Sequence, residues 1–99
     1  MPELLTDIAL TVAVNDLDGW TGDRKAIRRT VEAPDFPTAI RIVDTVAIAA
    51  EDMNHHPDID IRWRNLHFLL TTHDAGGVTE LDTRLAANID AIVRDFGGK

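Results

Sequence analysis

Four histidines lie in one stretch of this 99-residue chain, and they are its clearest candidates for chemistry. Histidine has an ordinary pKa of about 6.5, so it gives or takes a proton near neutral pH. His55 and His56 stand directly before Pro57, and a proline pushes the preceding residue out of the helical conformation. We therefore expect this pair on a fixed rim where a helix ends. His73 follows a predicted strand and is also expected at the end of an element.

Three interpretations of this histidine cluster follow from the residues alone. Any single histidine is most often a surface or packing residue, although four in one stretch fit that interpretation less well. A zinc site needs three or four ligands in tight geometry, whereas adjacent His55 and His56 diverge in direction and His67 falls in mid-strand. The third interpretation is general acid–base catalysis by imidazoles, without a metal or a covalent nucleophile.

The composition of the chain excludes several classes of protein. Its 17 acidic and 10 basic residues give a net charge of −7, which argues against a general affinity for nucleic acid or anionic membranes. No apolar run approaches the ~20 residues that span a bilayer, and the N-terminus lacks a signal-peptide pattern, so we expect a cytoplasmic protein. The absence of cysteine excludes disulfides, thiolate chemistry and cysteine-based metal sites.

Three segments have the patterns of helices, namely 6–17, 36–53 and 79–96. Asp35 is a candidate N-cap for the second, and Thr79 and Asp82 have the form of a capping box for the third. This position gives Asp82 a structural role as a helix-capping acid. The first segment is ambiguous, because its apolar residues alternate as in a strand while its two ends resemble helix ends. We interpret it as a helix.

Three further segments alternate like strands, namely 25–33, 59–63 and 66–70. The last two are predicted to form a hairpin through the short link Arg64-Asn65. Arg29 has the parity of the core-facing residues, which indicates a sheet end or a groove. The chain is therefore predicted to be one α+β domain, residues 1–99, with a four-stranded antiparallel sheet and three helices packed on one face.

The segment 51–57, with its His-His-Pro, resembles the signature of the pterin-4a-carbinolamine dehydratases. The similarity continues through Trp63, Thr72-His73, Gly76-Gly77, Thr79, Asp82 and Leu85-Ala86, and upstream through Leu17, Gly19-Trp20 and Asp35-Phe36. It thus covers nearly the whole chain. Members of this family have helices on one face of a four-stranded antiparallel sheet and assemble as homodimers or as homotetramers of two dimers. Such an assembly would cover the run 46–50, which is apolar nearly all round.

The resemblance implies a dehydratase that acts on a 4a-hydroxytetrahydropterin, the product left when an aromatic amino-acid hydroxylase uses its pterin. No electron moves in this dehydration, so no redox cofactor is expected. Some relatives instead act as a dimerisation cofactor for a transcription factor or as an assembly factor for a large enzyme. A non-catalytic binding module is therefore the alternative function.

The resemblance also implies roles for individual residues. His55 and His73 are the candidate acid–base pair, and His56 is expected to orient the substrate. Glu51, one helical turn before His55, would favour the protonated form of that imidazole. Trp63 would form an apolar wall for the pterin, or else belong to the core of the sheet. The residues expected to bind the substrate are Glu51, Pro57, Trp63 and Asp82.

Overall fold

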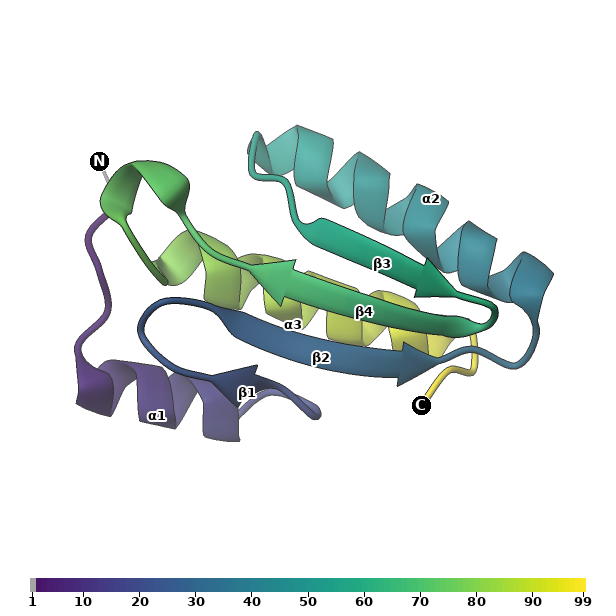
Figure 1. Ribbon diagram of the computed structural model, residues 1–99, viewed down its shortest axis with the longest axis horizontal. Coiled ribbons are helices and arrows are strands. Elements are labelled where there is room, and N and C mark those ends of the chain that lie inside the picture. The colour runs from purple at the N-terminus through teal and green to yellow at the C-terminus, as the bar shows by residue number, and fades with distance from the viewer. Residues whose placement is uncertain (1) are drawn as a thin grey trace.

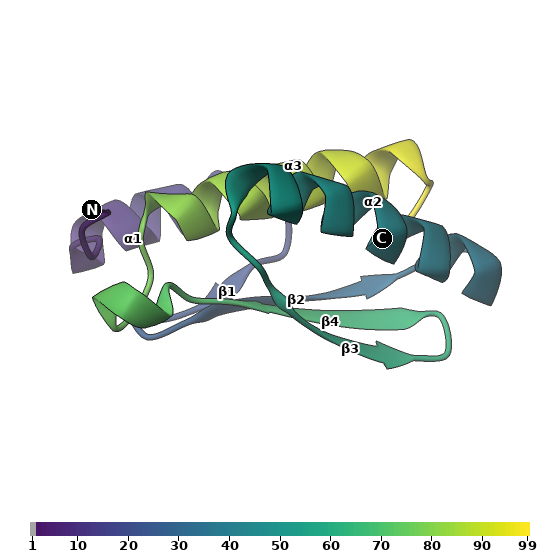
Figure 2. The same cartoon turned by 90° about the horizontal axis from the view of Figure 1, so that it is seen from above.

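Three helices, four strands and one short 3-10 helix make up residues 2–99, the part of the chain that the computed structural model describes. In chain order they are α1 (Asp7–Asn15), β1 (Thr21–Gly22), β2 (Ile27–Glu32), α2 (Phe36–Met53), β3 (Asp58–Arg62), β4 (Asn65–Leu70), η1 (His73–Ala75) and α3 (Glu80–Asp95). The strands form one antiparallel sheet in the order β1-β2-β4-β3, with all three helices on one face (Figure 2). The predicted α+β fold is confirmed.

Side-chain caps define where the helices begin. Thr6 Oγ1 accepts the Ala9 N–H at 3.1 Å before α1. Asp35 Oδ1 accepts the Thr38 N–H at 2.8 Å before α2, and the predicted capping box precedes α3. The helical interpretation of the first segment is confirmed. Its strand-like alternation is misleading because α1 buries only Leu10, so its apolar spacing reflects little packing.

The core lies between the sheet and the helices. Val31 pairs with Leu66, and Ile27 pairs with Leu70, across β2 and β4. All four side chains are buried and share one face of the sheet. The buried residues of the two long helices are Ala39, Ile42, Val46, Ala50, Leu85, Ala86, Ile89 and Val93. Burial of each large apolar side chain contributes about 1.5–3 kcal/mol, so the sheet and these helices form a rigid base for the residues at their ends.

One charged pair interrupts this core. Arg29 points from the middle of β2 toward α3, where its guanidinium donates to Asp90 Oδ1 at 2.5 Å. Asp90 also accepts the Trp20 Nε1–H at 2.8 Å and the Asp18 N–H at 2.9 Å. The inward parity of Arg29 therefore marks a buried ion pair and not the predicted sheet end or groove. Its partner lies 61 positions away in the sequence, beyond the reach of any local pattern.

The β3–β4 hairpin turns one residue earlier than predicted. Arg62 pairs with Asn65, so Trp63 and Arg64 form the turn. Trp63 has a φ of 56°, an uncommon left-handed conformation for a large side chain, and it is 66% exposed. The Arg64 guanidinium carbon lies 4.8 Å from the centroid of its ring. Trp63 is therefore not part of the sheet core.

Helix α2 leaves large apolar side chains exposed on its outer side. Ile48 is 65% exposed and Phe36 is 47% exposed, whereas Val46 and Ala50 are buried. The predicted covering of this helix by a second subunit stays a prediction. Apolar as α2 is, no helix within residues 2–99 combines the length and hydropathy needed to cross a membrane.

Candidate active site

The ends of several elements meet at one end of the molecule and surround an open pocket of about 380 Å³. Helix α2 ends there, β3 begins, β4 ends, and η1 and the start of α3 lie nearby (Figure 1). The lining residues are Asn54, His55, His56, Pro57, Asp58, Thr71, Thr72, His73 and Asp74. The pocket thus brings together the three predicted catalytic histidines and Pro57.

The end of α2 sets the direction of the two adjacent histidines. Asn54 closes the helix in the left-handed conformation, φ 49° and ψ 42°, which asparagine tolerates better than most residues. The His55 N–H then donates to Ala50 O at 3.0 Å. Pro57 keeps the preceding residue extended, so His55 and His56 point to opposite sides. As a result His55 is buried and His56 is exposed.

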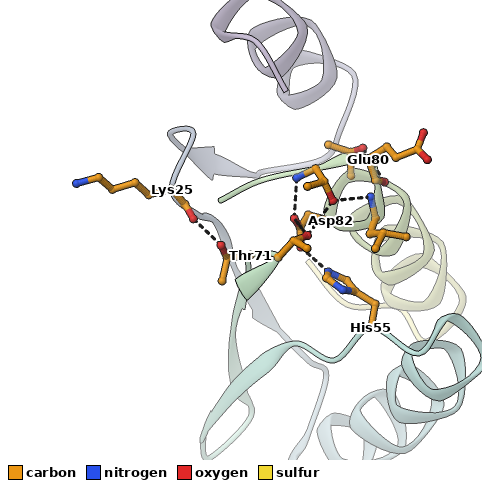
Figure 3. A network of polar contacts seen from close by, with 9 residues as sticks. Lys25, His55, Thr71, Glu80 and Asp82 are labelled. Carbon is orange, nitrogen blue, oxygen red and sulfur yellow. Dashed lines mark hydrogen bonds and ion pairs between the residues drawn. The ribbon is translucent and has the colours of Figure 1, made fainter. Parts of the chain in front are cut away.

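His55 is 9% exposed and contacts a fully buried carboxylate. Its Nε2 lies 2.6 Å from Asp82 Oδ1 in the first turn of α3 (Figure 3). Asp82 Oδ2 accepts the Thr79 N–H at 2.9 Å and the Thr72 hydroxyl at 2.8 Å. Asp82 therefore completes the capping box, as predicted, and also holds the imidazole. Because it is buried behind His55, the structure does not support its predicted contact with substrate.

His56 pairs with Glu51 on the surface of the molecule. Its Nε2 lies 2.9 Å from Glu51 Oε2, and both side chains are more than half exposed. The expected contact between Glu51 and His55 is absent, because the left-handed Asn54 ends the helix before the next turn is complete. An exposed pair of this kind contributes about 0–1 kcal/mol. Glu51 thus orients His56 from outside and does not line the pocket.

His73 is the first residue of η1 and is exposed at the pocket rim. Its imidazole makes no hydrogen bond or ion pair to any other residue within 2–99. The loop behind it is held by Gly77, where a Cβ would lie 2.3 Å from Arg24 O. The Val78 N–H donates to the same carbonyl at 2.8 Å. A glycine is therefore required for the approach that fixes the position of η1.

The structure places two aromatic residues, Trp63 and His67, away from the pocket. Trp63 lies at the hairpin tip, at the opposite end of β3 from Asp58, and five residues of strand span about 17 Å. Within one chain Trp63 therefore does not form the expected wall for a ligand in this pocket. His67 lies on the outer face of the sheet, where its Nδ1 is 2.9 Å from Thr30 Oγ1, and it takes no part in the site.

Together these groups suit proton transfer at an open pocket. One imidazole contacts a buried carboxylate, a second contacts an exposed carboxylate, and the third is unpartnered within the described residues. Across residues 2–99, no three histidine, aspartate or glutamate side chains converge where they would hold a metal ion. The arrangement is able to deliver a proton to one atom of a bound molecule and remove one from another.

Comparison with known proteins identifies the family. The family model described as pterin 4 alpha carbinolamine dehydratase matches residues 3–92. The chain belongs to the pterin-4-alpha-carbinolamine dehydratase family. A protein from Nocardia farcinica that is provisionally named a pterin-4-alpha-carbinolamine dehydratase is 53% identical over 92 residues. The match covers 93% of this chain and 97% of that protein. Another, from Roseiflexus castenholzii, is 50% identical over 93 residues, 94% of this chain and 100% of its own length.

Two solved structures of pterin dehydratase type resemble this fold. The transcriptional coactivator/pterin dehydratase of Brucella melitensis has a TM-score of 0.86 and 37% identity, over 89% of this chain and 96% of its own. A pterin dehydratase-like protein identified as a RuBisCO assembly factor in the alpha-carboxysome has a TM-score of 0.63. It is 19% identical, over 76% of this chain and 89% of its own, so that likeness concerns the fold alone.

The contacts behind His55 were not predicted from the sequence of this dehydratase-family chain. No role was predicted for Thr72, and Thr79 was predicted only as part of a helix cap. Their shared contact with Asp82 depends on β4 ending beside the first turn of α3, which no local spacing reports. The capping box was the one available signal, because a carboxylate that accepts the N-cap N–H through one oxygen has the other oxygen left for a second partner.

Proposed function

We propose that this chain is a hydro-lyase that converts a 4a-hydroxytetrahydropterin to the quinonoid dihydropterin, in the recycling of the pterin used by an aromatic amino-acid hydroxylase. The observation that carries the proposal is the convergence of His55, His56 and His73 on one pocket. The pocket volume, about 380 Å³, lies within the range of small-molecule sites. Membership of the dehydratase family supports the same reaction class.

The reaction requires two proton transfers. The C4a–O bond breaks as the departing hydroxyl receives a proton, N5 loses its proton, and the C4a=N5 double bond forms as water leaves. One imidazolium supplies the first proton, and one neutral imidazole takes the second. We assign these tasks to His55 and His73, which enter the pocket from different elements. No electron is transferred, so the reaction itself requires no redox cofactor.

The remaining site residues are proposed to position the substrate. His56, held by Glu51 at 2.9 Å, is placed to donate or accept a hydrogen bond at the pocket rim. Pro57 presents an apolar surface next to it. Both follow the left-handed turn at Asn54, so their positions relative to His55 are fixed by the backbone.

The test is stopped-flow dehydration of a chemically generated 4a-hydroxytetrahydropterin by the wild type, His55→Ala and His73→Ala. His67→Ala is the matched control, because this histidine lies on the outer face of the sheet. We expect large rate losses in the first two variants and none in the control, with circular dichroism unchanged. A wild-type rate equal to that of buffer would refute the proposal.

The exposed apolar residues of α2 favour a second role, in binding another polypeptide. The side chains of Ile48 and Phe36 are exposed to solvent, although the opposite side of the same helix packs in the core. We propose that a second copy of this chain covers them, giving a homodimer or homotetramer. Sedimentation of the wild type and of Ile48→Asp tests this, since the variant should have the lower mass. Stoichiometric recovery of a different protein in a pull-down would instead favour the binding-module function.

A further inference from the structure

A chain of hydroxyl groups runs from the start of α3 to His55. The Leu81 N–H donates to Thr79 Oγ1 at 3.2 Å, and Thr79 Oγ1 lies 2.8 Å from Thr72 Oγ1. Thr72 Oγ1 lies 2.8 Å from Asp82 Oδ2, and Asp82 Oδ1 lies 2.6 Å from His55 Nε2. The three contacts between side chains are buried, so water does not compete for them.

The direction of each hydrogen bond in this chain is determined. An ionised carboxylate only accepts, and a threonine hydroxyl has a single proton. The Thr72 hydroxyl therefore donates its proton to Asp82. In the contact between the two hydroxyls, Thr79 is the donor and Thr72 the acceptor. Thr79 in turn accepts from the Leu81 N–H. All donors in the chain thus point toward Asp82.

This direction determines which nitrogen of His55 faces the pocket. Asp82 accepts from Thr79 N–H and Thr72 through Oδ2, and its Oδ1 remains as an acceptor for His55 Nε2–H. Nδ1 of His55 makes no hydrogen bond to the rest of residues 2–99. It is not buried either, since Arg64 Nε is the one buried side-chain nitrogen or oxygen there without a partner. The Nδ1 atom is therefore accessible to solvent, on a residue that lines the pocket.

We infer that Thr72 is a positioning residue, whose hydroxyl holds the Asp82 carboxylate so that neutral His55 keeps its proton on Nε2 and presents the lone pair of Nδ1 to the substrate. The nitrogen that carries the proton on a histidine is set by the hydrogen bond that the other nitrogen makes. Only the expected effect of Thr72 on the dehydration rate rests on the proposed dehydratase function. Its effect on the ring of His55 is measurable without substrate.

Other ionisable groups share the pocket and enter any pH measurement. They are His56, Asp58, His73 and Asp74, with Glu51 behind His56. None of these groups is within hydrogen-bond distance of the His55 ring, whose one such partner among residues 2–99 is Asp82. A change confined to the signals of His55 therefore reports on the hydroxyl chain and not on the rim.

The test compares Thr72→Val, which keeps the branched shape and removes the hydroxyl, with Thr72→Ser, which keeps the hydroxyl. Nitrogen-15 NMR of labelled protein above pH 8 should show neutral wild-type His55 with its proton on Nε2. In Thr72→Val we expect averaged shifts of a ring exchanging between tautomers, with Thr72→Ser restoring the wild-type pattern. Thr11→Val, where the hydroxyl bonds only to Asp7 O on α1, is the matched control and should change nothing.

Kinetics supplies the second readout. Removing an outer hydrogen-bond partner of a metal-binding histidine costs about 10- to 100-fold, and we expect a kcat loss of similar size in Thr72→Val with KM nearly unchanged. Wild-type His55 with its proton on Nδ1 would overturn the inference even if Thr72→Val does not fold. An unchanged tautomer in a folded Thr72→Val variant would also overturn it. The expected shifts in a wild type without dehydratase activity would instead refute only the proposed function.

Discussion

Replacing Asp82 with asparagine tests whether the buried carboxylate prepares His55. In the wild type all three partners of this carboxylate are donors. The amide of asparagine has one accepting oxygen and an NH₂ group that only donates. Only one orientation satisfies Thr72 and Thr79, with the oxygen at the position of Oδ2. The NH₂ group then faces His55 Nε2, which must accept, and the proton of the neutral ring moves to Nδ1.

The size of the effect follows from this inversion. The pocket would meet an N–H where the wild type presents a lone pair, so one of the two proton transfers loses its acceptor. The same substitution in a serine protease triad lowers kcat about 10⁴-fold. We expect a loss of about 10²- to 10⁴-fold for Asp82→Asn, or about 3–5 kcal/mol in the barrier. Folding should suffer less, by about 1–3 kcal/mol, because each hydrogen bond persists without its charge.

The assay pairs stopped-flow dehydration with urea denaturation of the same preparations. Asp82→Ala is the contrasting variant, because it leaves three buried donors without a partner. At about 1–3 kcal/mol for each, it should lose at least about 3 kcal/mol of stability. An Asp82→Asn protein with wild-type kcat would refute the reasoning. So would an Asp82→Asn protein that is no more stable than Asp82→Ala, because the single satisfied orientation would then not exist.

Three further predictions concern stability and pH. Asp90→Ala strands the buried Arg29 guanidinium, so urea denaturation should show a loss of about 3–5 kcal/mol. The dehydration rate should be bell-shaped near neutral pH, because one imidazole must be charged and another neutral; a flat profile from about pH 5 to 9 with chemistry rate-limiting would contradict this. Hydrogen bonds from the Thr38 side chain and N–H hold the pKa of Asp35 below its ordinary 3.8. Because this pKa is lower in the folded state, the ionised Asp35 carboxylate stabilises the fold above about pH 4, and this contribution is lost as the pH falls. The melting temperature of Asp35→Asn should therefore fall less steeply at acid pH than that of the wild type.

Local chemistry explains why much of this molecule was predictable from sequence. Asp35 and the Thr79–Asp82 capping box start their helices through residues three positions apart, so the sequence displays them directly. Pro57 likewise disfavours the helical conformation at His56, the residue directly before it, so the sequence indicates that the helix ends close to this pair. Alternation and helical spacing likewise predicted the three longer strands and the three helices, whereas the two-residue strand β1 (Thr21–Gly22) is too short to show alternation.

Contacts between distant segments were not predictable. His55 meets Asp82 across 27 positions, and Arg29 meets Asp90 across 61, so neither pair leaves a local pattern. The predicted contact between Glu51 and His55 was wrong because the left-handed Asn54 changes the direction of the chain before His55. Trp63 failed as part of a strand because a turn of two residues starts one position earlier than the apolar alternation indicates.

Because Asp82 both caps α3 and holds His55, the orientation of the His55 imidazole depends on whether the first turn of α3 is formed. The same carboxylate closes the first turn of that helix and holds His55, so the fraction of molecules with a prepared imidazole is limited by the fraction in which this turn is wound. Helix ends fray with much smaller opening free energies than the whole domain. Mild heat or denaturant that unwinds this turn should therefore reduce activity before the sheet melts. The hydrogen-exchange rates of the Thr79 and Leu81 amides should rise with the same unwinding, so that catalytic activity reports whether the first turn of α3 is formed.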